Sequence, residues 1–108
     1  MKSLKSLVKV YDNVLPRDIC KRLINTFESH PELQERFDDD GYPNFTQMNL
    51  TKNQLKIGTE EHEVLQNVSF ACLKMYEKDL DLQGEFPAEY ALEQFRLKKY
   101  KNDGYDRF

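Results

Sequence analysis

Two histidines have the widest chemical range of any side chains in this sequence, because imidazole can bind a metal or transfer a proton near neutral pH. His30 stands two residues before Glu32, and His62 lies further along. By residue type, these three match the two histidines and one carboxylate that bind non-haem Fe(II) in other proteins. However, His30 precedes a proline at the end of an expected helix, and His62 falls among the glutamates of another. We therefore interpret both histidines as solvated residues rather than as metal ligands.

The two cysteines, Cys20 and Cys72, have neither the number nor the spacing of a disulfide framework or a zinc site. Each lies beside apolar residues on an expected helix, which is typical of partly buried thiols in a reducing compartment. The N-terminus lacks the continuous apolar stretch and small-residue cleavage site of a secretory signal. No apolar run approaches the roughly 20 residues of a membrane span. The sequence predicts a cytoplasmic protein that does not enter a membrane.

A basic stretch with an aromatic neighbour, Arg96–Lys101, is the one candidate for nucleic-acid binding. In a strand, its charges would divide between two faces. The chain as a whole has 16 Lys and Arg against 19 Asp and Glu, a net charge of −3. Nucleic acid is therefore not an expected partner.

Glycine-rich phosphate-binding motifs and the nucleophile elbow are absent from the sequence, which has only four glycines. The acidic residues stand in charged runs that are typical of solvated surfaces. A chain of 108 residues, 39% of them hydrophobic, suffices for one domain with a thin core. The residues alone predict a small α+β domain without a self-contained active site.

The first elements that would position these groups are a short strand over Val8–Asp12 and a helix over Pro16–Ser29. The helix is expected to bury one stripe, made of Ile19, Leu23, Ile24 and Phe27. Polar, turn-forming residues fill 32–44, including a turn at Asp38–Gly41, and predict a loop.

A second strand is expected over Phe45–Leu50, and a second long helix opens at Thr59 as its N-cap, with acidic residues in its first turn. Its broad apolar stripe predicts packing against a sheet and consists of Val64, Leu65, Val68, Ala71, Cys72, Met75 and Tyr76. Alternation over Tyr90–Tyr100 favours a third strand, followed by a turn at Lys101–Gly104.

Both ends of the sequence resemble the prolyl 4-hydroxylase-like 2-oxoglutarate/Fe(II)-dependent oxygenases. The segment Val10–Pro16, followed by Ile19-Cys20 and Leu23-Ile24, looks like the strand and helix at the start of that family's domain. The segment Glu93–Phe108 is similar to the strand and turn that lead into the family's H-x-D motif. The resemblance implies an α+β fold made of the N-terminal helices and first strands of a double-stranded β-helix, or jelly roll. Residues 1–108 would then be a single, incomplete domain.

Tyr100, Gly104 and Phe108 match the tyrosine, glycine and aromatic residue that precede the iron ligands in this family. The H-x-D motif, the distal histidine and the basic residue for 2-oxoglutarate would all come after Phe108. Tyr100 is therefore the one functional position that carries over, as a wall or hydrogen-bond donor of the 2-oxoglutarate pocket. A sheet tyrosine with an exposed hydroxyl is the plain alternative for Tyr100.

By this resemblance, the complete domain would be an oxidoreductase, a dioxygenase that uses Fe(II) and 2-oxoglutarate to hydroxylate a peptidyl or small-molecule C–H bond. The chain alone lacks the family's three metal ligands and is expected to bind neither Fe(II) nor 2-oxoglutarate. An incomplete jelly roll would expose a sheet edge, so the expected partners are a second copy or a missing C-terminal half. The alternative function is a stand-alone protein-interaction module that uses that edge.

Overall fold

The structure is a computed structural model that describes residues 4–38, 43–82, 84–85, 91–102 and 104–106. It has an α+β fold with three α-helices and a small, open, antiparallel sheet of three strands. In chain order the elements are η1 (Leu4–Leu7), α1 (Arg17–Ser29), η2 (Pro31–Leu33), β1 (Glu35–Asp38), β2 (Asn44–Asn49), α2 (Leu50–Asn53), α3 (Thr59–Asp79) and β3 (Arg96–Lys99).

Helix α1 begins directly after Pro16, which suits the first turn because it has no N–H to leave unpaired. The helix ends at Ser29, before Pro31. These bounds confirm the predicted helix. Its buried residues are Ile19, Leu23 and Phe27. Ile24 was expected in the same stripe, but it is 61% exposed because it faces sideways from the buried row.

The sheet has the order β1-β2-β3, with β2 in the centre. Strand β2 confirms the predicted strand, except that Leu50 begins α2 instead of ending the strand. Strand β1 lies in the segment for which the sequence predicted a loop, which was wrong for these four residues. It forms by pairing with β2, with Phe37 opposite Phe45. The turn predicted at Asp38–Gly41 falls mostly outside the described residues.

The strand predicted over Val8–Asp12 is wrong, because this segment is not in the sheet and ends in a turn. Val8 and Val10 are 70% and 78% exposed, so no neighbouring strand covers the alternating side chains. The segment crosses over α3 instead, where the Tyr76 hydroxyl donates to the Leu7 carbonyl at 2.8 Å. The third predicted strand exists but is confined to β3.

Helix α3 has Gly58 as its N-cap, one residue earlier than predicted. Gly58 adopts a left-handed conformation with φ of 64°, and the hydroxyl of Thr59 donates to the Gln54 carbonyl. The two acidic residues of the first turn, Glu60 and Glu61, are where the sequence placed them. The helix N-terminus carries partial positive charge, which stabilises carboxylates there.

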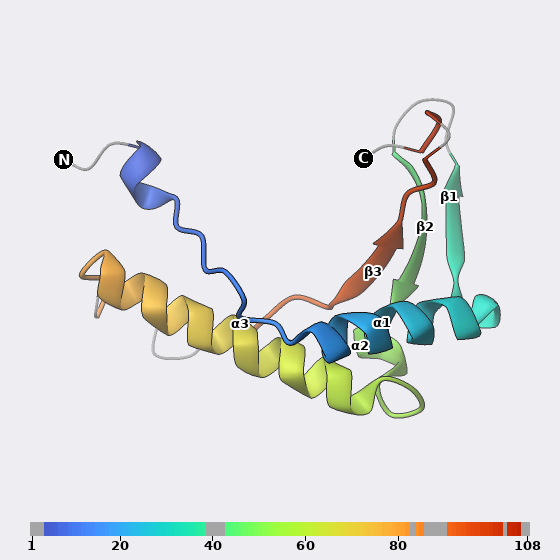
Figure 1. The fold of residues 1–108 in the computed structure, drawn as a ribbon, viewed down its shortest axis with the longest axis horizontal. Coiled ribbons are helices and arrows are strands. Elements are labelled where there is room, and N and C mark those ends of the chain that lie inside the picture. The colour runs from blue at the N-terminus through green and yellow to red at the C-terminus, as the bar shows by residue number, and fades with distance from the viewer. Residues whose placement is uncertain (1–3, 39–42, 83, 86–90, 103, 107–108) are drawn as a thin grey trace.

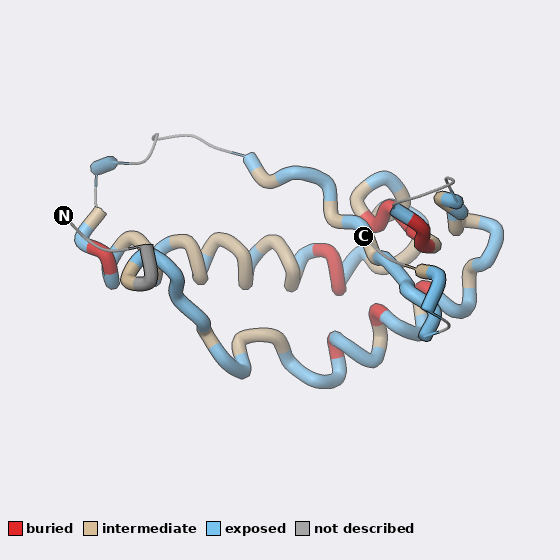
Figure 2. Tube along the Cα trace, turned by 90° about the horizontal axis from the view of Figure 1, so that it is seen from above, coloured by how far each residue is buried: buried red, intermediate tan, exposed pale blue. Residues whose placement is uncertain are grey.

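The expectation that α3 packs on a sheet is wrong. It lies beside α1, and the sheet rises from the opposite side of α1 at one end of this pair (Figure 1). The apolar stripe of α3 is therefore only half-buried along most of its length, which Figure 2 shows as intermediate exposure. Met75 is 37% exposed. The sequence shows that the helix is amphipathic, but not which element covers it.

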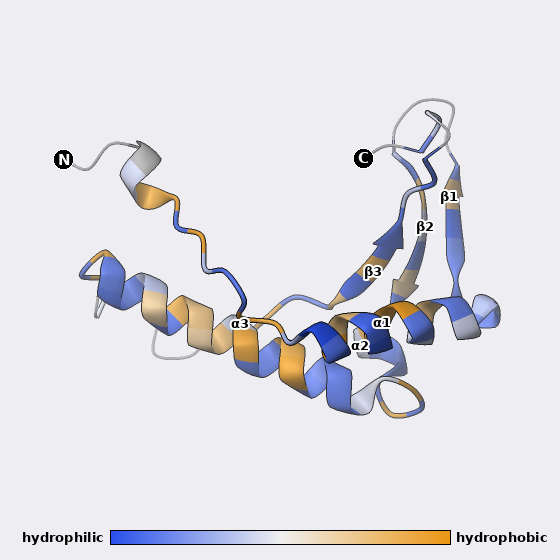
Figure 3. Cartoon of the chain, viewed as in Figure 1, coloured by the Kyte–Doolittle hydropathy of each residue, from blue (hydrophilic) through white to orange (hydrophobic). Residues whose placement is uncertain are grey.

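The core lies where α1, α2 and the start of α3 meet the sheet. Its centre is Ile19, Leu23 and the fully buried Leu50, and the half-buried side chains packed around it are Leu15, Val64, Leu65, Phe95 and Leu97. Apolar residues follow the facing sides of α1 and α3 in Figure 3. No helix among the described residues is long and apolar enough to cross a membrane.

Candidate functional site

The register of the sheet divides its side chains into two faces. Phe45 of β2 pairs with Phe37, and Gln47 pairs with Lys98, so these side chains share one face. Met48 pairs with Leu97, and Thr46 pairs with Lys99, on the other face. Leu97 packs against the core that α1 helps to form, so α1 covers the second face. The first face is the candidate site.

We call this first face the aromatic-basic face and define it by Phe37, Phe45, Arg96, Lys98 and Tyr100. The rings of Phe37 and Phe45 are stacked with their centroids 5.1 Å apart, and Tyr100 lies 5.5 Å from Phe45. The Lys98 ammonium sits 4.7 Å from the centroid of the Phe45 ring, which is a cation–π contact. Phe45 is 5% exposed, so its neighbours on this face cover it.

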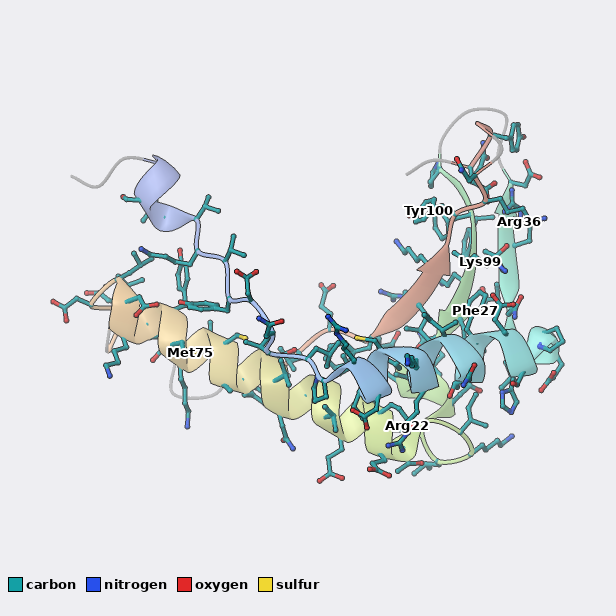
Figure 4. The ribbon with its side chains drawn as sticks, viewed as in Figure 1. Arg22, Phe27, Arg36, Met75, Lys99 and Tyr100 are labelled. Carbon is teal, nitrogen blue, oxygen red and sulfur yellow. The ribbon has the colours of Figure 1, made fainter. Side chains whose placement is uncertain are left out.

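Arg96, Lys98 and Tyr100 alternate along β3 and its continuation, which brings two cations and a phenol onto one face. The Gln94 side-chain oxygen accepts hydrogen bonds from Arg96 at 3.3 Å and from the Asn49 amide at 3.0 Å. This network holds the guanidinium beside the sheet. Tyr100 is 37% exposed. Figure 4 labels it near the end of β3. The chemistry of this group suits a small dicarboxylate, because guanidinium and ammonium groups bind carboxylates and a phenol donates to them.

The opposite face carries an apolar groove of about 310 Å³ between α1 and β3. Its lining residues are Leu23, Ile24, Phe27, Glu28, Leu97, Lys98 and Lys99. Lys99, labelled beside β3 in Figure 4, donates to the Glu28 carboxylate at 2.7 Å, and both residues line the groove. Both of these side chains are about half exposed, at 46% and 51%, so the pair contributes little to stability.

A cluster of polar side chains joins the turn after β3 to β1. Asp106 is 1% exposed at its side chain and lies 2.6 Å from Arg36. The hydrogen bonds from Arg36 and from the Lys101 backbone lower the pKa of the Asp106 carboxyl to about 2. Tyr105 donates to Asp38 at 2.7 Å, which raises the pKa of its phenol. For this region the sequence predicted only the turn at Lys101–Gly104 and not this cluster.

The histidines do not behave as predicted. His62 is 2% exposed, so its interpretation as solvated was wrong. Its Nε2 is 2.9 Å from the Thr51 hydroxyl, and its ring meets Phe95 edge-on at 5.4 Å. His30 is half-buried, and its Nδ1 donates to the Thr26 carbonyl at 2.8 Å.

Within the described part of the chain, no three His, Cys, Asp or Glu side chains are grouped as a metal site would need. The structure therefore does not bring His30, Glu32 and His62 together as ligands. The two cysteines are free thiols, and Cys20 is exposed rather than partly buried as predicted.

Comparisons with known proteins found no match for this chain among models of protein families, among curated proteins or among solved structures.

Proposed function

We propose that residues 1–108 form the N-terminal portion of a prolyl 4-hydroxylase-like 2-oxoglutarate/Fe(II) oxygenase domain, namely its supporting helices and the first strands of its jelly roll. The observation that supports this proposal is the asymmetry of the sheet. Helix α1 covers one face, while the aromatic-basic face carries Arg96, Lys98 and Tyr100. A domain that binds its cosubstrate between two sheets needs such a polar inner face on its first sheet.

In this proposal Tyr100 lines the 2-oxoglutarate pocket, and its hydroxyl donates to the cosubstrate. The residues present fit that dicarboxylate, because Lys98 supplies a cation on the same face. The described residues do not fit Fe(II), since they contain no group of three suitable ligands. The complete cytoplasmic enzyme would hydroxylate a peptidyl or small-molecule C–H bond, with iron ligands supplied by further sequence or by a second chain.

The test is to read the gene beyond the codon for Phe108 and to produce the protein that it encodes. We expect an H-x-D motif shortly after this residue. The longer protein should show the absorption band of an Fe(II)·2-oxoglutarate complex and convert 2-oxoglutarate to succinate. The 108-residue chain should do neither. Tyr100→Phe in the longer protein should raise the KM for 2-oxoglutarate more than it lowers kcat.

Tyr76→Phe is the matched control, since it also removes one tyrosine hydroxyl, but from α3, where that hydroxyl donates to the Leu7 carbonyl. Two results would contradict the proposal. One is a stop codon directly after Phe108 with no separately encoded second half. The other is a stoichiometric Fe(II)·2-oxoglutarate band from the 108-residue chain.

A second candidate function is a protein-interaction module that uses the open edge of the sheet. The observation that favours it is the place of β3, which is the last strand of the sheet order and borders the groove against α1. A strand edge beside an apolar groove is the arrangement that binds extended peptides by adding a strand.

A further inference from the structure

The outer edge of β3 offers backbone groups at alternate residues. The Leu50 N–H donates to the Phe95 carbonyl at 2.9 Å, which continues the pairing of β2 with β3. Because hydrogen-bonded and non-hydrogen-bonded pairs alternate in an antiparallel ladder, Leu97 and Lys99 point their backbone groups toward β2. Arg96 and Lys98 point theirs away from it. Among the described residues, no strand pairs with this outer edge.

The apolar floor of the groove lies next to this edge. Leu23 and Phe27 are 8% and 6% exposed, whereas Ile24 is 61% exposed although it lines the same groove. Ile24 therefore leaves apolar area uncovered beside a strand edge. A segment added to that edge would bury this side chain. In Figure 1, β3 is the edge strand on the side that faces the N-terminal segment.

The side chains of an added strand would alternate between the two faces of the sheet. Residues that pair with Arg96 and Lys98 would place their side chains on the aromatic-basic face, beside the two cations. The residue between them would pair with Leu97 and place its side chain into the groove. The edge therefore selects a segment in which acidic and apolar residues alternate.

A second copy of this chain does not satisfy that alternation. If two β3 strands paired antiparallel, Arg96 and Lys98 of one copy would lie opposite the same basic residues of the other. Like charges directly opposite each other in a sheet are destabilising. Charge complementarity thus favours a different chain as the occupant.

We propose that the groove between α1 and β3 binds an extended segment of a partner protein, with alternating acidic and apolar residues, as a fourth strand of the sheet. This inference rests on the second candidate function and names the class of its partner. The glutamate or aspartate side chains lie beside Arg96 and Lys98. The apolar side chains enter the groove against Ile24 and Leu97.

The test uses the 108-residue chain and a fluorescein-labelled nine-residue peptide of alternating glutamate and valine, blocked at both ends. Fluorescence anisotropy should show saturable binding that weakens as salt is raised. Ile24→Glu and Lys98→Glu should each weaken binding at least tenfold. Lys74→Glu, a charge reversal on the exposed side of α3, is the matched control and should leave binding unchanged. Circular dichroism checks that each variant is folded.

Two further peptides test the geometry of the added strand. N-methylation of the glutamate nitrogens removes the donors that face Arg96 and Lys98 and should abolish binding. N-methylation of the valine nitrogens blocks only the far edge of the peptide and should have little effect. A peptide with lysine in place of glutamate should not bind.

The proposal is overturned if the glutamate-valine peptide does not bind at millimolar concentration, or if the lysine peptide binds equally well. Equal effects of the two N-methylated peptides would also overturn it, because backbone pairing would then not take place. A dimer in light scattering that Ile24→Glu dissociates would assign the groove to a second copy instead. None of these results bears on 2-oxoglutarate turnover by the longer protein, so the two proposals fail independently.

Discussion

Asp106 and Arg36 are joined by two hydrogen bonds, with both guanidinium terminal nitrogens donating to the carboxylate at 2.6 Å and 3.2 Å. The backbone N–H of Lys101 donates to the same carboxylate at 2.8 Å. These contacts hold the turn after β3 against β1, at the end of the sheet where Tyr100 lies. An ionised carboxylate therefore joins the turn that follows Tyr100 to β1.

The first prediction concerns acid stability. Asp106 has a pKa of about 2 in the folded protein, against 3.8 for an ordinary aspartate, because Arg36 and Lys101 donate to its charged form. A folded pKa below the unfolded value stabilises the fold above about pH 4, and this contribution is lost as pH falls toward 2. Asp106→Asn should lower the urea midpoint at pH 7 and flatten its dependence on pH between 4 and 2.

Glu63→Gln is the control, because it changes an exposed carboxylate on α3. It should leave the pH dependence of the urea midpoint between pH 4 and 2 unchanged. If Asp106→Asn kept the same pH dependence as the parent, the ion pair with Arg36 would not be the source of acid sensitivity.

The second prediction concerns Gly58. Its φ is +64°, and a Cβ placed there would lie 2.7 Å from Cδ1 of Leu50, which is fully buried and cannot move aside. Gly58→Ala should lower the free energy of unfolding by about 2–4 kcal/mol, through backbone strain and overpacking together. Gly84→Ala has a similar φ of +85° but meets nothing within 4 Å, so it should cost only about 1–2 kcal/mol. Equal losses in urea unfolding would show that the contact with Leu50 carries no cost.

The third prediction concerns the hydroxyl of Thr51, which joins two elements far apart in the sequence. It accepts from the Phe95 N–H at 2.8 Å and lies 2.9 Å from Nε2 of His62. Thr51→Val keeps the shape but leaves the buried imidazole and the backbone N–H without a partner, which should cost about 1–3 kcal/mol. Thr51→Ser retains the hydroxyl and should recover most of that stability. Equal losses in the valine and serine variants would refute this role.

Local patterns were enough to predict α1 and β2. Pro16 and Pro31 bracket the helix, and its apolar residues recur at helical spacing. Strand β1 could not be predicted in the same way. Its four residues contain one apolar side chain, Phe37, and they become a strand because β2 supplies the ladder. The residues of one segment do not show which distant segment it will pair with, so this pairing could not be predicted from β1 alone.

The candidate site could be predicted only in part. The sequence predicts Tyr100 on a face of a strand, but its aromatic neighbour Phe45 comes from a strand that is distant in the sequence. His62 was misplaced because Glu61 and Glu63 flank it and suggest solvent. A usable signal existed, since His62 lies three residues before Leu65 and so extends the apolar stripe of α3 by one turn.

The last prediction concerns Tyr11, which ties the N-terminal segment to α3. Its hydroxyl donates to the Asp79 carboxylate at 2.7 Å. Desolvation and this carboxylate raise the pKa of the Tyr11 phenol from 10.0 to about 12. A folded pKa above the unfolded value means that the contact stabilises the fold below pH 10 and is lost as pH rises through 12. Tyr11→Phe should speed tryptic cleavage after the exposed Lys9 at neutral pH, because the N-terminal segment then loses this bond to α3. The far-ultraviolet circular dichroism should stay unchanged. In the parent protein, ultraviolet difference absorption should show one tyrosine that ionises at about pH 12, and this step should be missing from the variant. An unchanged rate of cleavage after Lys9 in the variant would show that this segment is held without the bond to Asp79.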